Sequence, residues 1–258
     1  MMLTCLSSAY PTIVELLPGY EKMESFFLSL PSLFKKEEGQ LIHDGRNQLR
    51  ILTYEEERFV VKAYKKPVFI NRLVYGIFRS SKAKRSLENA LLLRSIGVGT
   101  PEPIGYINLR KGFLFTQSFL VTRLSTCPYR YDMLFQRHFD FEEKVLREIG
   151  RITANLHEHG ISHLDYGRGN ILFDETPDGN IHVELVDLNR IKRGPVDMIK
   201  GCKNLERLPA TEQMHRWIAE EYAKARNYDE EKCFQLMRKF RKVQPGHEVN
   251  EFPEETGK

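Results

Sequence analysis

The chain has 258 residues, 41% of them hydrophobic, which suits one large domain or two lobes with a substantial core. Its four cysteines are scattered without metal-ligand spacing, so we expect reduced thiols in a cytosolic protein rather than a disulfide framework or a metal site. The start lacks a basic leader and no apolar run reaches ~18–20 residues, so we expect no signal peptide and no spanning helix. The net charge is +4, and we expect no nucleic-acid partner.

The charge is distributed unevenly along the chain. The stretch from Arg58 to Arg94 holds ten lysines or arginines and one acid, Glu88, which gives it a local charge of +9 and leaves −5 for the rest. A block of this density favours an anionic partner such as phosphates, acidic sugars or an anionic membrane surface. The alternative is a solvated basic face, which is the commoner outcome for charge runs.

The first half of the chain reads as one helix followed by short strands. Within residues 1–40 we predict a helix over roughly Lys22–Leu30, ended by Pro31. Two apolar, β-branched runs, Leu49–Tyr54 and Arg58–Tyr64, flank an acidic turn at Glu55–Glu57 and predict an antiparallel hairpin. A helix capped by Ser80 or Ser81 is predicted to end at Gly97, followed by a strand pair over residues 103–108 and 112–122.

The second half is mostly helical. Apolar residues between Phe141 and Leu156 recur at helical spacing and predict a four-turn amphipathic helix. Two further helices are expected, one around residues 214–225 and one ending near residues 238–242. Residues 244–258 are expected to form a disordered tail.

One loop between these regions has the residues that phosphoryl transfer requires. His163-Leu164-Asp165 is followed five residues later by Asn170, and a predicted hairpin with its turn at residues 176–180 returns to Asp187. A carboxylate on a loop can take the proton of an acceptor hydroxyl, while an amide oxygen and a second carboxylate are ligands that Mg²⁺ prefers. For the loop alone, a polar turn that starts a strand remains the alternative.

These motifs resemble those of the protein-kinase-like superfamily, whose catalytic loop reads H-x-D-x-x-x-x-N and whose metal motif reads D-F-G. The resemblance implies an α+β, two-lobed protein-kinase-like fold, with a small β-rich N-lobe over residues 1–124, including an N-terminal extension 1–40, and a mostly helical C-lobe over residues 125–243. It implies an ATP-dependent kinase that uses ATP and Mg²⁺. Asp165 and Asn170 would be catalytic, and Asn170 and Asp187 would hold the metal.

The resemblance also implies a nucleotide site in the first lobe. Lys62, on the strand Val60-Val61-Lys62-Ala63, would hold the α- and β-phosphates together with Glu88. The turn at Gly45 takes the place of the glycine-rich phosphate loop, and Thr122 and Leu124 lie where a kinase chain presents backbone groups to adenine. A solvent-facing lysine and an ordinary turn are the alternatives for Lys62 and Gly45.

Several departures narrow the kinase class. Leu164 stands where protein kinases carry arginine, Gly167 where they usually carry lysine, and no A-P-E motif follows Asp187. Asn189 replaces the glycine of D-F-G, and asparagine is a non-glycine residue that tolerates positive φ. A platform for a peptide substrate is therefore not expected.

The chain is most similar to the bacterial lipopolysaccharide kinase family. The similarity rests on Val61-Lys62, on residues 79–86 before Glu88, on the catalytic loop and on Val186-Asp-Leu-Asn-Arg190. It implies phosphorylation of a heptose or Kdo sugar of the lipid A–core, with a sugar or lipid-linked sugar as acceptor, in the cytoplasm or peripherally at the inner face of the cytoplasmic membrane. Two alternatives stay open, a soluble small-molecule kinase of the aminoglycoside or choline type and a non-catalytic kinase-fold scaffold.

The basic block suggests how such an enzyme would reach a lipid-linked acceptor. Its cationic residues are interleaved with apolar ones at Leu73, Val74, Tyr75, Ile77 and Phe78, a composition typical of a segment that lies at a headgroup surface. Five of the ten cationic residues belong to this basic segment, namely Arg72, Arg79, Lys82, Lys84 and Arg85. Near an anionic leaflet each charge contributes ~1 kcal/mol. A solvated basic loop packed on the lobe by its aromatic residues is the alternative.

Overall fold

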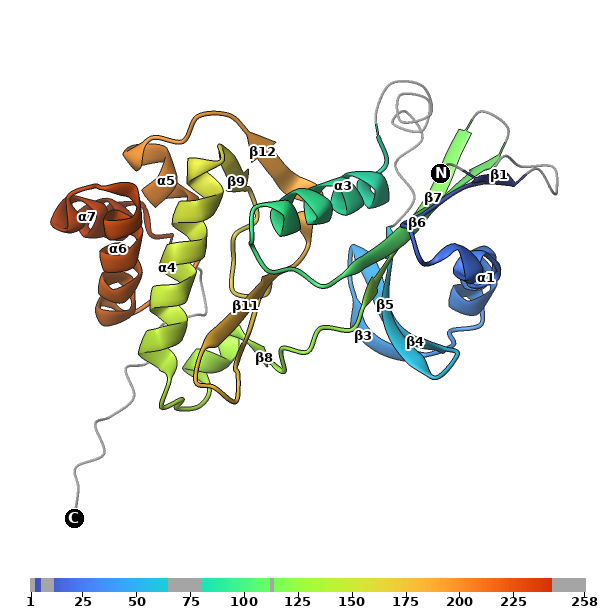
Figure 1. Ribbon diagram of the computed structural model, residues 1–258, viewed down its shortest axis with the longest axis horizontal. Helices are drawn as coiled ribbons and strands as arrows, with labels where there is room; N and C mark the ends of the chain where they lie inside the picture. Colours follow the sequence, from blue (N-terminus) through green and yellow to red (C-terminus); the bar gives the residue numbers. More distant parts are fainter. Residues whose placement is uncertain (1–2, 6–11, 65–79, 112–113, 243–258) are drawn as a thin grey trace, which may run out of the picture. The chain divides into compact units, whose positions relative to one another are not determined.

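The computed structural model describes residues 3–5, 12–64, 80–111 and 114–242 (Figure 1). Its contacts divide the chain into two compact units, Met1–Leu92 with Pro101–Ser125, and Leu93–Thr100 with Thr126–Lys258. The predicted division assigned every residue up to Leu124 to the first lobe. Leu93–Thr100 groups with the second unit instead, and the backbone N–H of Leu185 donates to the carbonyl of Gly99 at 2.9 Å.

The first unit is built on a seven-stranded antiparallel sheet in the order β1-β2-β6-β7-β5-β4-β3. The strands are β1 (Leu3–Cys5), β2 (Thr12–Leu16), β3 (Gln40–Asp44), β4 (Asn47–Tyr54), β5 (Glu57–Tyr64), β6 (Pro103–Lys111) and β7 (Leu114–Arg123). The predicted hairpin is present as β4 and β5, in a continuous register from Asn47↔Tyr64 to Tyr54↔Glu57. Its turn is tighter than predicted, because Glu57 already belongs to β5 and only Glu55 and Glu56 connect the strands.

The N-terminal part of this unit differs from the prediction in two ways. Helix α1 spans Glu24–Lys35 after the short 3-10 helix η1 (Glu21–Met23), so it passes through Pro31 instead of ending before it. The ring of Phe34 packs edge-on against Phe119, 5.1 Å between centroids, and this burial beyond the proline offsets the hydrogen bond that the proline cannot make. Strand β2 was not anticipated, although it pairs with β6 inside the sheet.

The two faces of the sheet have different roles. Phe59, Val61 and Ala63 alternate along β5 and join the core that α1 covers. Lys62 and Tyr64 point to the other face, where the hydroxyls of Tyr64 and Ser86 are 2.8 Å apart. Ser86 lies on α3 (Lys82–Ser95), and Ser81 caps this helix by accepting from the N–H of Lys84 at 3.0 Å, as predicted.

The second unit is organised around α4 (Glu142–Glu158), the predicted amphipathic helix. Helix α6 (Glu212–Arg226) packs along α4, and α7 (Glu230–Phe240) packs on α6 (Figure 1). Gly150 permits the close approach of α4 and α6, because a Cβ at this position would lie 2.5 Å from the carbonyl oxygen of Ile218. A short helix, α5 (Met198–Asn204), was not predicted and begins at the N-cap Asp197.

Short strands complete the second unit and carry its loops. The predicted hairpin is formed by β10 (Ile171–Glu175) and β11 (Ile181–Leu185), with β8 (Tyr129–Arg130) on the other side of β10, and the 3-10 helix η2 (Tyr131–Phe135) follows β8. A separate pair joins β9 (Ile161–His163) to β12 (Ile191–Arg193), which follows the 3-10 helix η3 (Leu188–Arg190). The β10–β11 and β9–β12 pairings bring the residues around Asp165 and Asn170 close to those around Asp187.

Parts of the predictions fall beyond the described residues. The aromatic part of the basic segment, with Arg72 and Arg79, and the predicted tail from residue 244 lie there. None of the helices that the structure describes combines the length and the apolarity that a membrane crossing requires.

Candidate active site

His163 is the buried last residue of β9, where the loop to β10 begins. Its Nδ1 accepts from the backbone N–H of Asp165 at 3.1 Å, so Nε2 carries the proton and donates to the carbonyl of Val186 at 3.1 Å. Burial lowers the pKa of His163, and the Val186 carbonyl only partly opposes this effect. The ring is therefore neutral at physiological pH and joins the backbone of Asp165 to the residue before Asp187.

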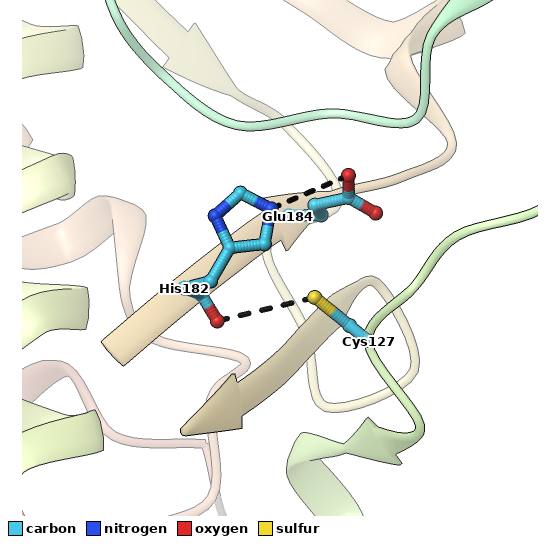
Figure 2. A group of neighbouring side chains, drawn as sticks. All are labelled: Cys127, His182 and Glu184. Carbon is cyan, nitrogen blue, oxygen red and sulfur yellow. Dashed lines mark hydrogen bonds and ion pairs between the residues drawn. The ribbon is translucent and has the colours of Figure 1, made fainter. Parts of the chain in front are cut away.

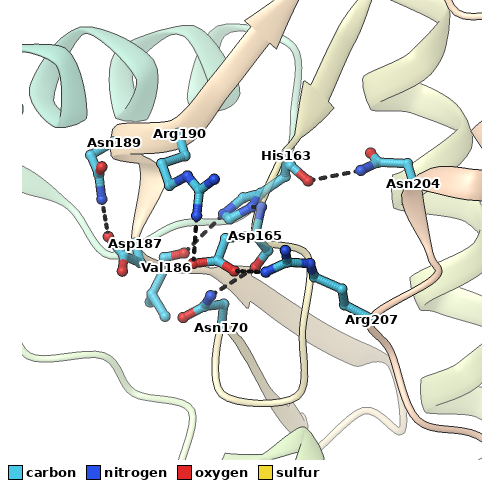
Figure 3. A network of polar contacts seen from close by, with 9 residues as sticks. All are labelled: His163, Asp165, Asn170, Val186, Asp187, Asn189, Arg190, Asn204 and Arg207. Carbon is cyan, nitrogen blue, oxygen red and sulfur yellow. Dashed lines mark hydrogen bonds and ion pairs between the residues drawn. The ribbon is translucent and has the colours of Figure 1, made fainter. Parts of the chain in front are cut away.

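Asn170 closes the loop. The side-chain nitrogen of Asn170 donates to the backbone carbonyl of Asp165 at 2.8 Å (Figure 3). The backbone carbonyl of Asn170 accepts from the N–H of Val186 at 3.0 Å. Because the side-chain nitrogen makes the bond to Asp165, the side-chain oxygen of Asn170 is directed away from that bond. The predicted residues Asp165, Asn170 and Asp187 are thus held in one hydrogen-bonded neighbourhood.

Asp187 adopts the left-handed conformation, with φ 58° and ψ 50°. The sequence suggested positive φ for Asn189, but Asn189 belongs to the following 3-10 helix η3. Its side-chain nitrogen donates to Oδ1 of Asp187, so Asn189 orients this carboxylate. The residue that replaces the glycine of D-F-G therefore supports the metal motif through its side chain.

Asn170 and Asp187 fit a hard divalent cation. An amide oxygen and a carboxylate are the donors that Mg²⁺ selects, and it takes its remaining ligands from water and from phosphate oxygens. The hydrogen bonds that fix both side chains hold these donors in place before any cation binds. Asn170 and Asp187 could therefore hold the predicted Mg²⁺.

A buried polar chain supports the loop from behind, and the sequence did not reveal it. Asn204, at the end of α5, donates to the carbonyl of His163 at 2.8 Å, and its side-chain oxygen faces Nε2 of His157 at 3.0 Å. Nδ1 of His157 lies 3.0 Å from the hydroxyl of Tyr222 on α6. Burial lowers the pKa of His157 to about 4, which keeps this chain of hydrogen bonds uncharged.

Two arginines contact the predicted base and were also missed. Nη1 of Arg207 lies 3.2 Å from Oδ1 of Asp165, and Nη1 of Arg190 lies 3.8 Å from Oδ2 (Figure 3). Arg190 had been named only as the last residue of the Val186-Asp-Leu-Asn-Arg190 motif, without a role of its own. Arg207 follows α5, more than forty residues after Asp165, so sequence spacing offered no signal for it.

The predicted nucleotide residues belong to the first unit. Lys62 and Thr122 occupy the same face of the sheet, because Thr122 pairs with Val60, two residues before Lys62. Nζ of Lys62 lies 5.4 Å from the centre of the Tyr64 ring, and Glu88 lies 3.9 Å from Nζ of Lys84, one helical turn away. The predicted pairing of Lys62 with Glu88 stays a prediction.

Gly45 and Leu124 have ordinary backbone roles in the structure. The N–H of Gly45 donates to the carbonyl of Asn47 at 3.2 Å in the β3–β4 turn. The N–H of Leu124 donates to the carbonyl of Arg58 at 3.3 Å, next to the end of β7. Their contacts with phosphates and adenine stay predictions.

A second group of potential ligands lies around β11. The ligand atoms of Cys127, His182 and Glu184 are all within 4.8 Å of one another (Figure 2). The buried thiol of Cys127 donates to the carbonyl of His182 at 3.9 Å, and Nε2 of His182 lies 3.5 Å from Glu184. Cys127 forms no disulfide, as predicted, but its grouping with His182 and Glu184 was not predicted, because only the fold brings it to β11.

Comparison with known proteins gives both relatives and a fold. The 3-deoxy-D-manno-octulosonic acid kinase of Vibrio vulnificus (strain YJ016) is 27% identical over 149 residues, 54% of this chain and 61% of the relative. The enzyme of the same name from Stenotrophomonas maltophilia (strain K279a) is 30% identical over 138 residues, 51% of each chain. The matches thus span less than two thirds of these relatives.

A solved structure described as WaaP in complex with acyl carrier protein superimposes with a TM-score of 0.61. It covers 88% of this chain and 96% of that one at 15% identity, which supports the protein-kinase-like α+β fold. The profile of the Lipopolysaccharide kinase (Kdo/WaaP) family matches residues 34–228, which include β4, β5, the catalytic loop and Asp187. With this match over most of its length, the chain belongs to the lipopolysaccharide kinase (Kdo/WaaP) family.

Proposed function

We propose that this protein transfers the γ-phosphoryl group of ATP to a hydroxyl of a Kdo or heptose sugar in the lipopolysaccharide core. The observation that supports the proposal is the hydrogen-bonded junction of Asp165, Asn170 and Val186, which ties the backbone of Asp165 to the residue before Asp187. Relatives named as kinases of 3-deoxy-D-manno-octulosonic acid support Kdo as the preferred acceptor.

Asp165 is the proposed general base. Its backbone is held from two sides, by Nδ1 of His163 on its N–H and by the amide of Asn170 on its carbonyl. The side chain is about one third exposed, so an acceptor hydroxyl can approach it from solvent. A carboxylate on a fixed backbone can accept the hydroxyl proton as the oxygen attacks phosphorus.

Asn170 and Asp187 would hold Mg²⁺ through their side-chain oxygens. When bound, the ion neutralises charge on the nucleotide phosphates. Lys62 and Glu88 would position the α- and β-phosphates, with Gly45 over them and with Thr122 and Leu124 near adenine. The partial exposure of Lys62 supports this assignment, because Lys62 lies on the same face of β5 as Tyr64, whose hydroxyl contacts Ser86 of α3.

A panel of acceptors tests the proposal. The chain would be incubated with ATP, Mg²⁺ and one acceptor at a time, namely Kdo-containing core, heptose-containing core, an aminoglycoside and choline. We expect phosphate on the core sugars, at least tenfold more with Kdo than with either cationic alcohol. Faster transfer to the cationic alcohols would replace the proposal with a small-molecule kinase. A protein that transfers nothing and shows no Mg²⁺-dependent stabilisation by ATP would be a scaffold.

A further inference from the structure

The carboxylate of Asp165 lies next to two guanidinium groups. Arg190 reaches Oδ2 from η3, and Arg207 reaches Oδ1 from the segment after α5 (Figure 3). With Asp187 assigned to the metal, the side chains of Asp165, Arg190 and Arg207 together carry a net positive charge. Since one carboxylate cannot neutralise two guanidinium groups, this cluster is suited to take up a further anion.

The two pairs are too exposed to serve mainly as structural supports. The side chains of Arg190 and Arg207 are 51% and 44% exposed, and that of Asp165 is 35% exposed. Ion pairs between solvent-accessible groups add little to stability. Their guanidinium groups remain accessible to a solute that approaches Asp165.

The backbones that carry these arginines are fixed to the catalytic loop. The carbonyl of Arg190 accepts from the N–H of Leu164 at 2.8 Å, next to Asp165. The segment of Arg207 is anchored by Leu205 and Leu208, which are both buried. The guanidinium groups are therefore positioned beside the base at a small cost in ordering before a ligand arrives.

We propose that Arg190 and Arg207 form a subsite for a carboxylate of the acceptor sugar. The planar fork of a guanidinium group matches a carboxylate in two parallel hydrogen bonds. An acceptor carboxylate would pair with the arginines in place of Asp165 and leave the carboxylate oxygens of the base free for the hydroxyl. The proposal rests on the proposed function, and it makes an acidic sugar the substrate class of this site.

The test compares an acidic core sugar with the same sugar after reduction of its carboxyl group to an alcohol. Binding of both to the full chain is measured without ATP, and steady-state transfer is measured with ATP and Mg²⁺. The variants are Arg207→Gln, Arg190→Gln and the conservative Arg207→Lys. Arg193→Gln is the control, because Arg193 is an exposed arginine on β12, three residues after Arg190.

We expect Arg207→Gln to weaken binding of the acidic sugar at least tenfold and to raise its KM by a similar factor. The reduced sugar and ATP should change less than about threefold, and Arg207→Lys should retain part of the affinity. Equal losses for acidic and reduced sugars would overturn the subsite and make the arginines positioning residues for Asp165. Unchanged binding of the acidic sugar would overturn it as well.

The binding arm separates this inference from the proposed function. Selective loss of the acidic sugar in the arginine variants would support the subsite even if the parent transferred no phosphate. Phosphate transfer by the parent with no preference for the acidic sugar would overturn the subsite and leave the kinase assignment standing. A phosphate-bearing sugar without a carboxylate serves as a third ligand, and equal binding of it would overturn the assignment to carboxylate.

Discussion

The loop owes its shape to histidines that carry no charge. His163 is completely buried and uses both ring nitrogens on backbone groups, so its part is to hold Asp165 in place. Behind it, His157 connects Asn204 to Tyr222. Protonating His163 would put a donor at Nδ1, where an acceptor is needed for the N–H of Asp165, and protonating either ring would place a charge in the interior.

This arrangement predicts how stability depends on pH. The pKa of His157 is about 4 in the folded state and 6.5 in the unfolded state. Between these two pH values the unfolded chain binds a proton at His157, whereas the folded chain does not. The stabilisation is complete above pH 6.5 and is lost as the pH falls toward 4, by roughly 3 kcal/mol for this residue. Urea unfolding between pH 7.5 and 4.5 measures the loss.

His157→Gln should be less stable than the parent at pH 7.5 and should lose less stability on acidification. His163 and His215, whose pKa values burial also lowers, would keep part of the slope. His138→Gln is the control, because His138 is exposed. A His157→Gln slope equal to that of the parent would contradict this assignment.

Some residues of the site could be predicted from the sequence, and others could not. His163, Asp165, Asn170 and Asp187 could be found because the loop and the hairpin fix their spacing along the chain. Arg207 approaches Asp165 only because α5 and the segment after it pack against the loop. The sequence around Arg207 contains no motif that predicts this contact. Residues brought in by tertiary packing carry no pattern in a single sequence.

Among the elements, those with strong periodicity were predicted well. Helix α4 and the β4–β5 hairpin follow their apolar patterns closely. The prediction ended helix α1 at Pro31, but the helix continues to Lys35, because the packing of Phe34 overrides the local propensity. Strand β2 and helix α5 were missed because they have only five and seven residues, too few to show a period.

The β4–β5 turn carries a conformational cost that a substitution can relieve. Glu55 and Glu56 both have positive φ, 48° and 66°, where two-residue turns favour asparagine and glycine. Glu56→Gly should therefore raise the free energy of unfolding by about 0.5–1 kcal/mol, because glycine enters the left-handed region without a Cβ penalty. Glu56→Ala removes the same charge and keeps the Cβ, so it should bring no gain. Equal gains from both variants in urea unfolding would mean that charge, rather than backbone conformation, limits the turn.

For the whole molecule, the predicted machinery is divided between two units. Lys62 and Glu88 belong to the first, while Asp165, Asn170 and Asp187 belong to the second, and the family match spans both. We further propose that the basic segment attaches the enzyme to an anionic membrane where its lipid-linked acceptor lies. Lys82 and Lys84 begin α3, and Arg79 lies outside the described residues.

Neutralising Arg79, Lys82, Lys84 and Arg85 together should remove about 4 kcal/mol of attraction to anionic vesicles at low salt. Co-sedimentation with vesicles rich in anionic lipid measures this loss, and the affinity for ATP should change little. The control variant neutralises four exposed basic residues on α6 and α7, namely Lys224, Lys232, Arg238 and Lys239. Vesicle binding that survives the first variant, or that is lost equally in both, would contradict a docking role for the segment.

The central claim is that Asp165 is the base of a sugar kinase, and the most direct measurement compares the parent with Asp165→Asn. Phosphate transfer from ATP to the acidic core sugar should fall by about 10²–10⁴-fold, the usual contribution of a positioned base. Stabilisation by ATP with Mg²⁺ should persist in the variant, and Asp140→Asn, at a carboxylate that is almost fully exposed, should transfer phosphate like the parent. Transfer by Asp165→Asn at the parental rate would contradict the claim.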